Sequence, residues 1–486
     1  MKTLPYLITF LFFIACCASC DNDDDFSTDG NLRLSFSSET IKFDTVFTSF
    51  GTSTRRLKVY NKNKNALSIN SIALMNAEKT GFRMNVDGES GNSINNVDIL
   101  AEDSIYVFIE ATIYPLNQNT PLLIADSIRF QFNGVTQYVR LEAIGQDVIL
   151  WEGKTIDKDT ILTGEKPFLI YETLHVNPNV TLTLNENVHL YFHSKAKLFV
   201  EGSLQSKGTI EKPVVIRGDR TDLFLESLNV PYDRVPGQWE GIEIASGSFN
   251  NLFENTQIRS SIYGILFQQS EPTQLKASLL NTIVQNTTKE NIFAINCKIE
   301  AKNSLFANSG TSSVNLIGGD YNFLHCTIAS YIPGGNLGWD RNRKQALILA
   351  NKGTDNQGNE LNIPLVNSQF INTIISGKSS PEIKLEKNDN IAFNHTFTNC
   401  LIKAAGTDDS NFINTVWNVN PAFKYIYDPY STEENPQYYY FNYQLTENSP
   451  ARNKASRQYA AELPEDIKGN SRRSDEAPDI GCYEWQ

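Results

Sequence analysis

A short pattern of apolar and polar positions recurs six times between residues 253 and 402. It reads apolar, any residue, Asn, small residue, any residue, apolar, with His in place of Asn once. A repeat of roughly 20–30 residues made of strand-forming residues predicts a parallel β-solenoid. The Asn or His positions, at intervals of 26, 22, 22, 47 and 27 residues, are Asn255, Asn281, Asn303, His325, Asn372 and Asn399.

The residue types of the repeat suit one coil of a solenoid. The small residue and the apolar residue after it are two positions apart, so on a strand both side chains point to one face. In a solenoid that face is the interior, where each residue stacks on its counterpart roughly 4.8 Å along the axis. Asn suits the bend before the strand, because it tolerates left-handed backbone and its amide can bond the amide of the next coil. We expect the following small residues inside: Thr256, Thr282, Ser304, Cys326, Thr373 and Cys400.

The interval of 47 residues is about twice the others. We interpret it as hiding one more coil, whose strand lies at residues 346–349.

A different pattern occupies residues 31–147, where apolar and polar residues alternate in short runs. Runs at 128–132 and 138–141 flank Asn133-Gly134, and Asn-Gly between alternating runs is a strong hairpin signal. Short strands separated by regular turn signals predict a β-sandwich. The segment resembles the immunoglobulin-like modules at the front of bacterial surface proteins, although it lacks their Cys…Trp…Cys pattern.

Near Trp151 the strand-like runs become shorter and follow one another closely, at residues 180–184, 188–192, 197–204, 208–216 and 238–242. This succession, continued by the Asn repeat, resembles the right-handed parallel β-helix superfamily, the fold of pectate lyases and many secreted polysaccharide-active proteins. The resemblance covers residues 151–402. It is specific for the fold and weak for the chemistry.

Residues 403–486 form a distinct tail of further coils and a cap. Its runs at 449–451, 466–472 and 478–484 resemble a C-terminal signature of bacterial β-helix surface proteins, with Cys482 where Ala is usual. Seven of the 20 tyrosines fall between 425 and 443. We expect that segment to cover the last coil, since an uncapped end would expose unpaired strand edges.

The first residues combine a charged end, an apolar run and small residues before Cys20. This order is typical of an export signal. With the acidic run after Cys20, it resembles a bacterial lipoprotein signal over residues 1–19, followed by an acidic linker over residues 20–30. The resemblance implies that Cys20 is acylated and that the protein faces outward from the outer membrane, anchored in the lipid bilayer. Cleavage at Cys16 or Cys17 remains an alternative.

The formal net charge is −13, and no basic run is present. This balance argues against nucleic acid as a partner. No phosphate-binding loop, zinc-type cysteine spacing or nucleophile elbow occurs, and we predict no metal site. The four cysteines after the leader are 297, 326, 400 and 482. Cys326 and Cys400 lie at least two coils apart, too far for a disulfide, and we interpret them as small core residues.

Three enzyme classes of the superfamily can be compared with the sequence. Polygalacturonase-like hydrolases need flanking carboxylates and a Gly-His-Gly, which is absent, and Asp408-Asp409 lies outside the repeated coils. The paired inward aspartates of pectin esterases are not identifiable. Lyases need a basic proton acceptor and usually calcium on clustered carboxylates. Residues 217–220 and 340–344 match that loose pattern, and we interpret both as solvated turn residues.

The sequence therefore predicts an all-β surface lipoprotein whose role is to bind glycan or to serve structurally or as an adhesin. The alternatives are a polysaccharide lyase with a degenerate site, for which calcium would be the cofactor, and an accessory subunit that binds other surface proteins. No catalytic residue is assigned.

A ligand site, if present, is expected in the excursion that follows His325. Loops on a rigid scaffold often carry function, and an aromatic ring can stack on a sugar while basic residues bind its carboxylates. The alternative is an ordinary loop whose Trp packs on the flank of the β-helix. The candidate residues are Trp339, Asp340, Arg341, Arg343 and Lys344.

Overall fold

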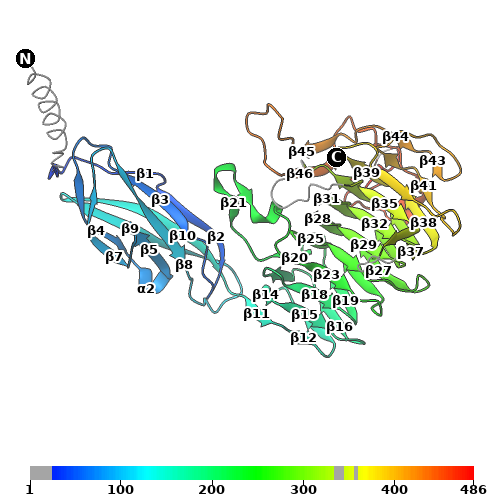
Figure 1. Ribbon diagram of the computed structural model, residues 1–486, viewed down its shortest axis with the longest axis horizontal. Coiled ribbons are helices and arrows are strands. Elements are labelled where there is room, and N and C mark those ends of the chain that lie inside the picture. The colour runs from blue at the N-terminus through cyan, green and yellow to red at the C-terminus, as the bar shows by residue number, and fades with distance from the viewer. Residues whose placement is uncertain (1–24, 333–343, 355–359, 475) are drawn as a thin grey trace, which may run out of the picture. The chain divides into compact units, whose positions relative to one another are not determined.

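The computed structural model describes residues 25–332, 344–354, 360–474 and 476–486 (Figure 1). The chain divides into two compact units, Met1–Asp147 and Val148–Gln486. Both units are built from strands, so the protein is all-β. Among the described residues, the short helix is α2 (Ala77–Thr80) and the 3-10 turns are η1 (Glu226–Leu228), η2 (Tyr232–Arg234) and η3 (Arg457–Ala461).

The first unit contains two five-stranded sheets. One sheet is β1 (Ser35–Phe36), β3 (Arg55–Tyr60), β8 (Ser104–Ala111), β5 (Phe82–Val86) and β6 (Glu89–Ser90), in that order. The other is β2 (Thr40–Phe47), β10 (Val135–Gln146), β9 (Leu122–Phe132), β4 (Leu67–Leu74) and β7 (Ser93–Ile99).

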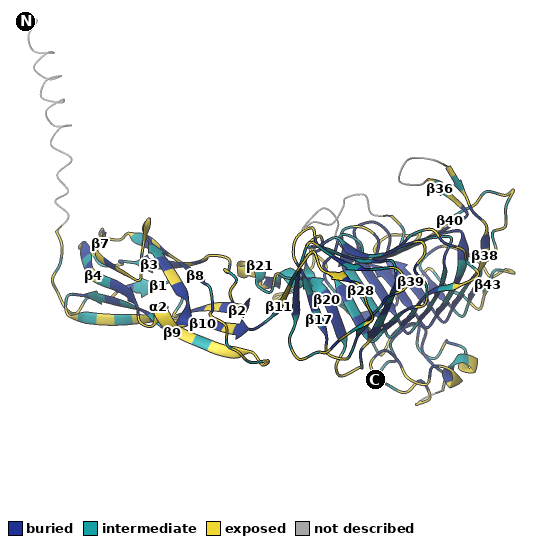
Figure 2. Ribbon diagram, turned by 90° about the horizontal axis from the view of Figure 1, so that it is seen from below, coloured by how far each residue is buried: buried dark blue, intermediate teal, exposed yellow. Residues whose placement is uncertain are grey.

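The two sheets enclose one apolar core, because their strands alternate between inward and outward residues. In β8, Ile105, Val107 and Ile109 are buried, whereas Tyr106 and Phe108 point outward and are exposed (Figure 2). The predicted hairpin forms, with β9 and β10 paired around the Asn133-Gly134 turn. The immunoglobulin-like topology remains a prediction.

The second unit is a parallel β-helix with three sheets along its length, each receiving one strand from most coils. The eleven-stranded sheet is β11 (Ile149–Glu152), β14 (Phe168–Tyr171), β17 (His189–Phe192), β20 (Val214–Gly218), β25 (Thr256–Arg259), β28 (Ile283–Thr287), β31 (Leu305–Ser309), β34 (Thr327–Ser330), β39 (Ile374–Gly377), β42 (Leu401–Ile402) and β44 (Val416–Trp417). The nine-stranded sheet is β12 (Thr155–Ile156), β15 (Thr173–Val176), β18 (Lys197–Val200), β23 (Gly241–Ile244), β26 (Ile265–Phe267), β29 (Ile292–Ile295), β32 (Val314–Ile317), β35 (Leu347–Ala350) and β40 (Ile383–Glu386).

The ten-stranded sheet completes each coil. It is β13 (Thr160–Leu162), β16 (Thr181–Leu184), β19 (Ser203–Lys207), β24 (Asn251–Glu254), β27 (Leu275–Leu280), β30 (Lys298–Lys302), β33 (Gly319–Leu324), β38 (Leu365–Ile371), β41 (Thr396–Thr398) and β43 (Phe412–Ile413). Three antiparallel hairpins leave the coils: β21 (Leu223–Leu225) with β22 (Val230–Pro231), β36 (Lys352–Thr354) with β37 (Glu360–Asn362), and β45 (Phe423–Ile426) with β46 (Phe441–Leu445).

The interior of the β-helix is a continuous apolar stack. The inward ring of Phe370 lies between Phe323 and Phe397, with ring centroids 5.0 and 4.8 Å away. Such stacking follows from in-register parallel pairing, which places equivalent residues of successive coils above one another. Figure 2 shows this interior as the buried side of the strands.

The predicted Asn row is confirmed. All six residues have positive φ, between 44° and 51°, and each lies between a strand of the ten-stranded sheet and one of the eleven-stranded sheet. Asn281 donates to the Asn255 side chain at 3.1 Å, and Asn372 bonds His325 at 2.9 Å. The small residues that follow are buried as predicted, and the four cysteines among the described residues are buried and free.

The interpretation of the 47-residue interval is wrong. Strands β34 and β39 pair directly, and the His325 and Asn372 side chains are in contact, so these residues belong to neighbouring coils. Residues 347–350 form the strand of that same coil in the nine-stranded sheet. The extra length is therefore insertion, part of it the hairpin β36–β37, because an interval alone cannot distinguish an insertion from an extra coil.

The tail packs along the outward face of the eleven-stranded sheet. Tyr443 and Ile480 share an apolar cluster with Leu305, Ala329 and Leu401 of that sheet. The contacts of Tyr443 therefore lie on a flank of the β-helix, and the prediction that the tyrosine-rich segment covers the last coil is wrong for this residue. The Asp408 and Asp409 carboxylates accept backbone N–H groups of the last coil, which makes them turn residues.

Candidate functional site

Most of the predicted ligand residues, namely Trp339, Asp340, Arg341 and Arg343, lie outside the described residues, as does the predicted lipidation residue Cys20. Lys344 is described. It is exposed, its backbone N–H donates to the Thr311 carbonyl at 3.2 Å, and it lines a groove of about 420 Å³ on the outward face of the nine-stranded sheet.

The floor of this groove consists of outward side chains that occupy the same strand position in successive coils. One outward residue per coil falls in a single row across the sheet, because parallel pairing repeats the same position in each coil. Leu266 pairs with Phe293, Phe293 with Asn315, and Asn315 with Ile348. The floor is therefore apolar except for Asn315, and its one aromatic ring, Phe293, is partly exposed.

Charged side chains surround that floor, with lysines in excess over glutamates. The lysines are Lys289, Lys344, Lys352 and Lys384, and the glutamates are Glu290 and Glu386. Lys384 forms an ion pair with Glu386. The Lys289 ammonium donates to the Tyr263 hydroxyl at 2.9 Å and lies 4.9 Å from the centroid of its ring. A partly apolar floor with basic walls has the chemistry to hold a sugar chain that carries carboxylates.

A second group of charged and aromatic side chains lies on the outward face of the eleven-stranded sheet, in its early coils. We call it the arginine cluster and define it by Tyr191, Arg217, Asp233 and Arg259. Tyr191 pairs with Arg217 in register, and Ile216 pairs with Ile258, so Arg217 and Arg259 follow side by side on adjacent strands. Asp233 arrives from a different direction, in the turn η2 of the loop that follows β20.

Both arginines converge on one carboxylate oxygen. Asp233 Oδ1 lies 2.9 Å from Arg217 Nη1 and 2.8 Å from Arg259 Nε. The Arg217 and Arg259 side chains are 12% and 20% exposed, so the contact is largely shielded from water. Burial lowers the pKa of Arg217, and Asp233 opposes this shift. Burial also lowers the pKa of nearby His189, and the two arginines lower it further, which reflects the positive potential they create.

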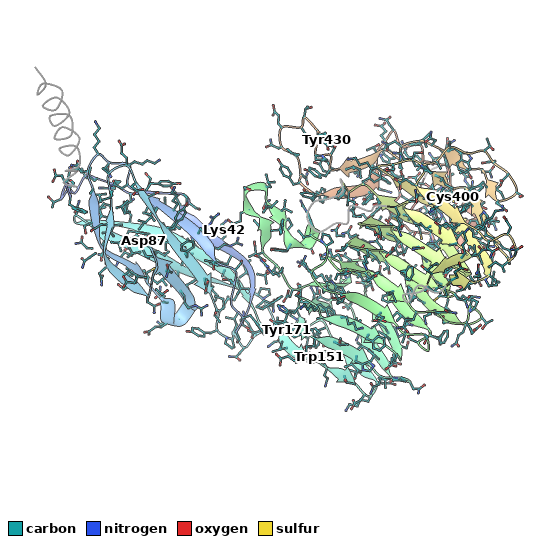
Figure 3. The ribbon with its side chains drawn as sticks, in the orientation of Figure 1. Lys42, Asp87, Trp151, Tyr171, Cys400 and Tyr430 are labelled. Carbon is teal, nitrogen blue, oxygen red and sulfur yellow. The ribbon has the colours of Figure 1, made fainter. Side chains whose placement is uncertain are left out.

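A histidine–carboxylate pair lies beside the arginine cluster, where strands β17 and β20 end. His193 Nδ1 is 2.7 Å from an Asp219 oxygen, and the Tyr171 ring packs against His193 at a tilt of 32°, with centroids 4.2 Å apart. Figure 3 labels Tyr171 at the first coils, far from Cys400 in the last ones. An ionised carboxylate only accepts, so a hydrogen bond from Nδ1 to Asp219 leaves Nε2 as the ring nitrogen that can face a ligand. The His193 side chain is 48% exposed. It is therefore placed to accept a proton from a ligand.

The interpretation of residues 217–220 as solvated turn residues is wrong for Arg217. Arg217 is on strand β20 and nearly buried. Arg220 does lie in the following turn. Its Nε and Nη2 atoms each donate a hydrogen bond of 2.7 Å to an oxygen of Asp222. The sequence reasoning missed Asp233, Arg259 and Tyr191. The one sequence signal of Tyr191 and Arg259 is an outward position in a strand, which is usable only once the register is known, and Asp233 lies in a turn that gives no such signal.

No group of three or more His, Cys, Asp or Glu side chains that could hold a metal ion occurs in the described part of the chain. Asp219 and Asp233 do not fit a calcium site together, because one is held by His193 and the other by two arginines. Within the same described residues, no helix is long and apolar enough to cross a membrane.

Comparisons with known proteins give the chain no family. No family model matches it. Among curated proteins, Protein bark beetle of Drosophila melanogaster is 32% identical over 119 residues, which cover 23% of this chain and 4% of that protein. The chain thus matches a small part of that relative's length.

Three solved structures with some likeness to the chain are carbohydrate-active enzymes. A family 28 exopolygalacturonase of Yersinia enterocolitica has a TM-score of 0.25 at 10% identity, over 74% of this chain and 89% of that one. A GH87 α-1,3-glucanase of Streptomyces thermodiastaticus has a TM-score of 0.14 at 8% identity, over 75% and 90%. A family 123 glycoside hydrolase of Clostridium perfringens has a TM-score of 0.18 at 9% identity, over 25% and 30%. With scores this low, the fold rests on the strand pairing described above.

Proposed function

We propose that the protein is an outer-membrane surface lipoprotein that binds an acidic polysaccharide along its β-helix. In this proposal Cys20 carries the lipid anchor, the first unit is an immunoglobulin-like spacer, and the β-helix is right-handed. The observation that supports glycan binding best is the groove on the nine-stranded sheet, with Phe293 in its floor and four lysines on its walls. A sugar ring would lie on Phe293, and its carboxylates would meet Lys344 and Lys352.

A matched pair of phenylalanines allows a direct test. Phe293 and Phe199 both point outward from the nine-stranded sheet and are partly exposed, but Phe199 does not line the groove. We expect oligogalacturonate binding, measured by calorimetry, to weaken roughly tenfold in Phe293→Ala and to persist in Phe199→Ala. Equal binding by both variants and the wild type would contradict the proposal.

A second candidate function, a polysaccharide lyase, is favoured by the His193–Asp219 pair beside the arginine cluster. In such a reaction His193 Nε2 takes the proton from the carbon next to the sugar carboxylate. The C–H electron pair becomes a carbon–carbon double bond, and the C–O bond to the neighbouring sugar breaks. The departing oxygen then takes up a proton from solvent. Arg217 and Arg259 supply positive charge for the substrate carboxylate, whose charge grows as the proton leaves.

The lyase candidate has its own matched control. His175 and Glu201 form a second histidine–carboxylate pair, 2.6 Å apart, on the nine-stranded sheet. If the lyase proposal is right, the ultraviolet absorbance of the unsaturated product rises when wild type is mixed with acidic polysaccharides. It should be lost in His193→Gln and retained in His175→Gln. No absorbance change with any acidic polysaccharide would leave glycan binding as the function.

A further inference from the structure

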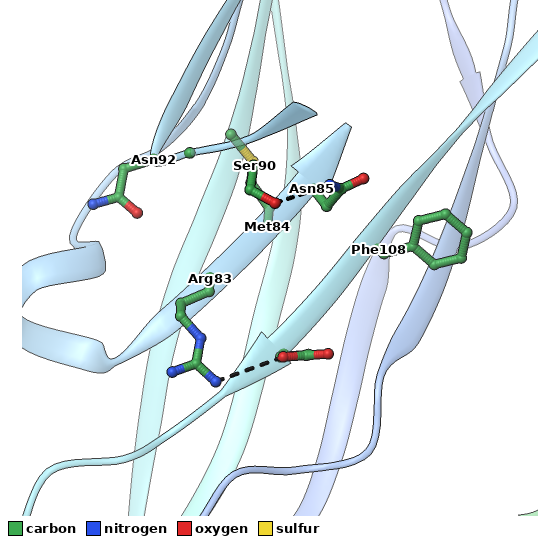
Figure 4. Close-up of a pocket in the computed structure, with 8 residues that line it drawn as sticks. Arg83, Met84, Asn85, Ser90, Asn92 and Phe108 are labelled. Atoms are coloured by element: carbon green, nitrogen blue, oxygen red, sulfur yellow. Dashed lines mark hydrogen bonds and ion pairs between the residues drawn. The ribbon is translucent and has the colours of Figure 1, made fainter. Parts of the chain in front are cut away.

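The first unit has a pocket of its own, of about 500 Å³, on the outward face of strands β5 and β8 (Figure 4). Strand register builds it: Arg83 is opposite Glu110, and Asn85 is opposite Phe108, so four outward side chains form two adjacent rows. The hairpin from β5 into β6 adds Ser90 and, beyond it, Gly91 and Asn92, which make the pocket's second wall.

An aromatic surface forms the other side of this pocket. Phe108 is 36% exposed, and its neighbour Tyr106 is 42% exposed. Their rings are stacked, with centroids 6.0 Å apart and planes 24° from parallel. The Lys58 ammonium lies 5.5 Å from the Tyr106 centroid and 5.2 Å from that of Tyr60, which holds these rings in place. The sheet therefore presents a fixed, partly exposed aromatic surface next to a hollow.

The polar groups of the pocket are held in place by neighbours and remain accessible. Asn85 Nδ2 donates to Ser90 Oγ at 2.9 Å, and Asn85 Oδ1 accepts the Gly88 N–H at 3.0 Å. Glu110 accepts the Thr54 hydroxyl at 2.6 Å and lies 3.6 Å from Arg83. The Arg83 and Glu110 side chains are 56% and 45% exposed.

We propose that this pocket binds one uncharged sugar unit of a glycan, with the sugar ring against Phe108. The planar Asn85, Glu110 and Arg83 groups offer donors and acceptors to ring hydroxyls. The sugar is uncharged because the charged residues lining the pocket, Arg83 and Glu110, face each other, so a carboxylate would have to displace Glu110. The site is separate from the lysine-lined groove of the β-helix and selects a different chemistry.

The test uses the chain from Asp21 onward, which lacks the proposed lipid anchor, and a panel of uncharged oligosaccharides built from glucose, xylose or mannose. Oligogalacturonate serves as the acidic comparison. Saturation-transfer NMR and calorimetry should detect an uncharged oligosaccharide, and its binding should weaken roughly tenfold in Phe108→Ala. Phe108 points away from the core, and an unchanged melting temperature would establish that the variant is folded. Arg83→Gln, which keeps a planar donor but breaks the ion pair, gives a second independent variant.

Two controls separate this site from others. Tyr138, 56% exposed on strand β10 of the other sheet, is a matched surface aromatic, so Tyr138→Ala should bind as wild type does. Phe293→Ala should also bind the uncharged oligosaccharide normally, whatever it does to oligogalacturonate. The proposal is overturned if no uncharged oligosaccharide binds, if oligogalacturonate alone binds at Phe108, or if Phe108→Ala and Tyr138→Ala behave alike.

Discussion

Replacing Arg472 by Met tests how the tail is held on the β-helix. The Arg472 side chain is fully buried and forms an ion pair with Glu484. Its Nη2 also donates to Asn303 Oδ1 at 2.6 Å and to the Gly481 carbonyl at 3.1 Å. One guanidinium therefore joins the Asn row of the coils to two of the three runs of the tail signature, 466–472 and 478–484. Met has a similar length and no charge, so the substitution removes the cation with little change in volume.

The expected loss of stability follows from Glu484, whose carboxyl group stays buried when Arg472 is replaced. Glu484 is buried beside Asp466 and Asp479, and burial raises the pKa of Glu484 while Arg472 lowers it. Removing one partner of a buried ion pair costs about 3–5 kcal/mol, since the other charge loses its compensation. Without Arg472 the pKa of Glu484 rises further. The loss of unfolding free energy in Arg472→Met is therefore smallest in acid solution, where Glu484 is protonated in both the variant and the wild type. This loss grows as the pH rises through the wild-type pKa of Glu484.

Urea titration followed by tryptophan fluorescence measures this cost, because Trp485 stacks on Arg452 in the same tail, 3.7 Å from its guanidinium carbon. Adding Glu484→Gln to Arg472→Met should recover much of the loss. Lys302→Met is the matched control: its ion pair with Glu462 is exposed, so the change should cost less than about 1 kcal/mol. A deficit in Arg472→Met no larger than in Lys302→Met, or one that shrinks at alkaline pH, would refute the reasoning.

Three further predictions concern the core, the tail and the anchor. Ile375→Ala, an inward and fully buried position, should lower the free energy of unfolding by about 2–5 kcal/mol in urea titrations, and a substitution at Asn255 should cost less. Gly481→Ala should loosen the tail and raise its cleavage by proteases, because Gly481 has φ +106° and an added Cβ would lie 2.8 Å from Ile374 Cδ1. Cys20→Ser should abolish metabolic acyl labelling, and undiminished labelling would move the anchor to Cys16 or Cys17.

The sequence predicted best those features that repeat locally. The Asn row was predictable because each bend needs the same left-handed residue directly before an inward small residue, as at Asn281 and Thr282. The strand near residues 346–349 was also predicted, but the number of coils was not, because the 47-residue interval has the length of two coils. Only the direct pairing of β34 with β39 shows that one coil carries insertions there.

The candidate sites were less predictable for a physical reason. Inward positions of a β-helix must be apolar or small and must stack, so they leave a pattern in the sequence, whereas outward positions face solvent and are free to vary. Tyr191, Arg217 and Arg259 are neighbours on the sheet, but successive members lie 26 and 42 residues apart in the chain. The second interval is longer because the loop carrying Asp233 lies between Arg217 and Arg259. The segment 217–220 can be recognised as basic in the sequence, but the burial of Arg217 cannot be deduced without the strand register.

Because outward positions are free to vary, the outward faces of the sheets of one β-helix can carry different types of side chain. The outward side of the eleven-stranded sheet carries the arginine cluster at its early coils, whereas its later coils are apolar and covered by the tail. The nine-stranded sheet carries lysines around an aromatic floor over its later coils. Because each outward residue is fixed by the inward stack beneath it, neighbouring coils hold these groups at a constant spacing of roughly 4.8 Å. Sugar units along a polysaccharide also repeat at regular intervals, so a row of outward residues can meet several units of one chain, which a single loop cannot do.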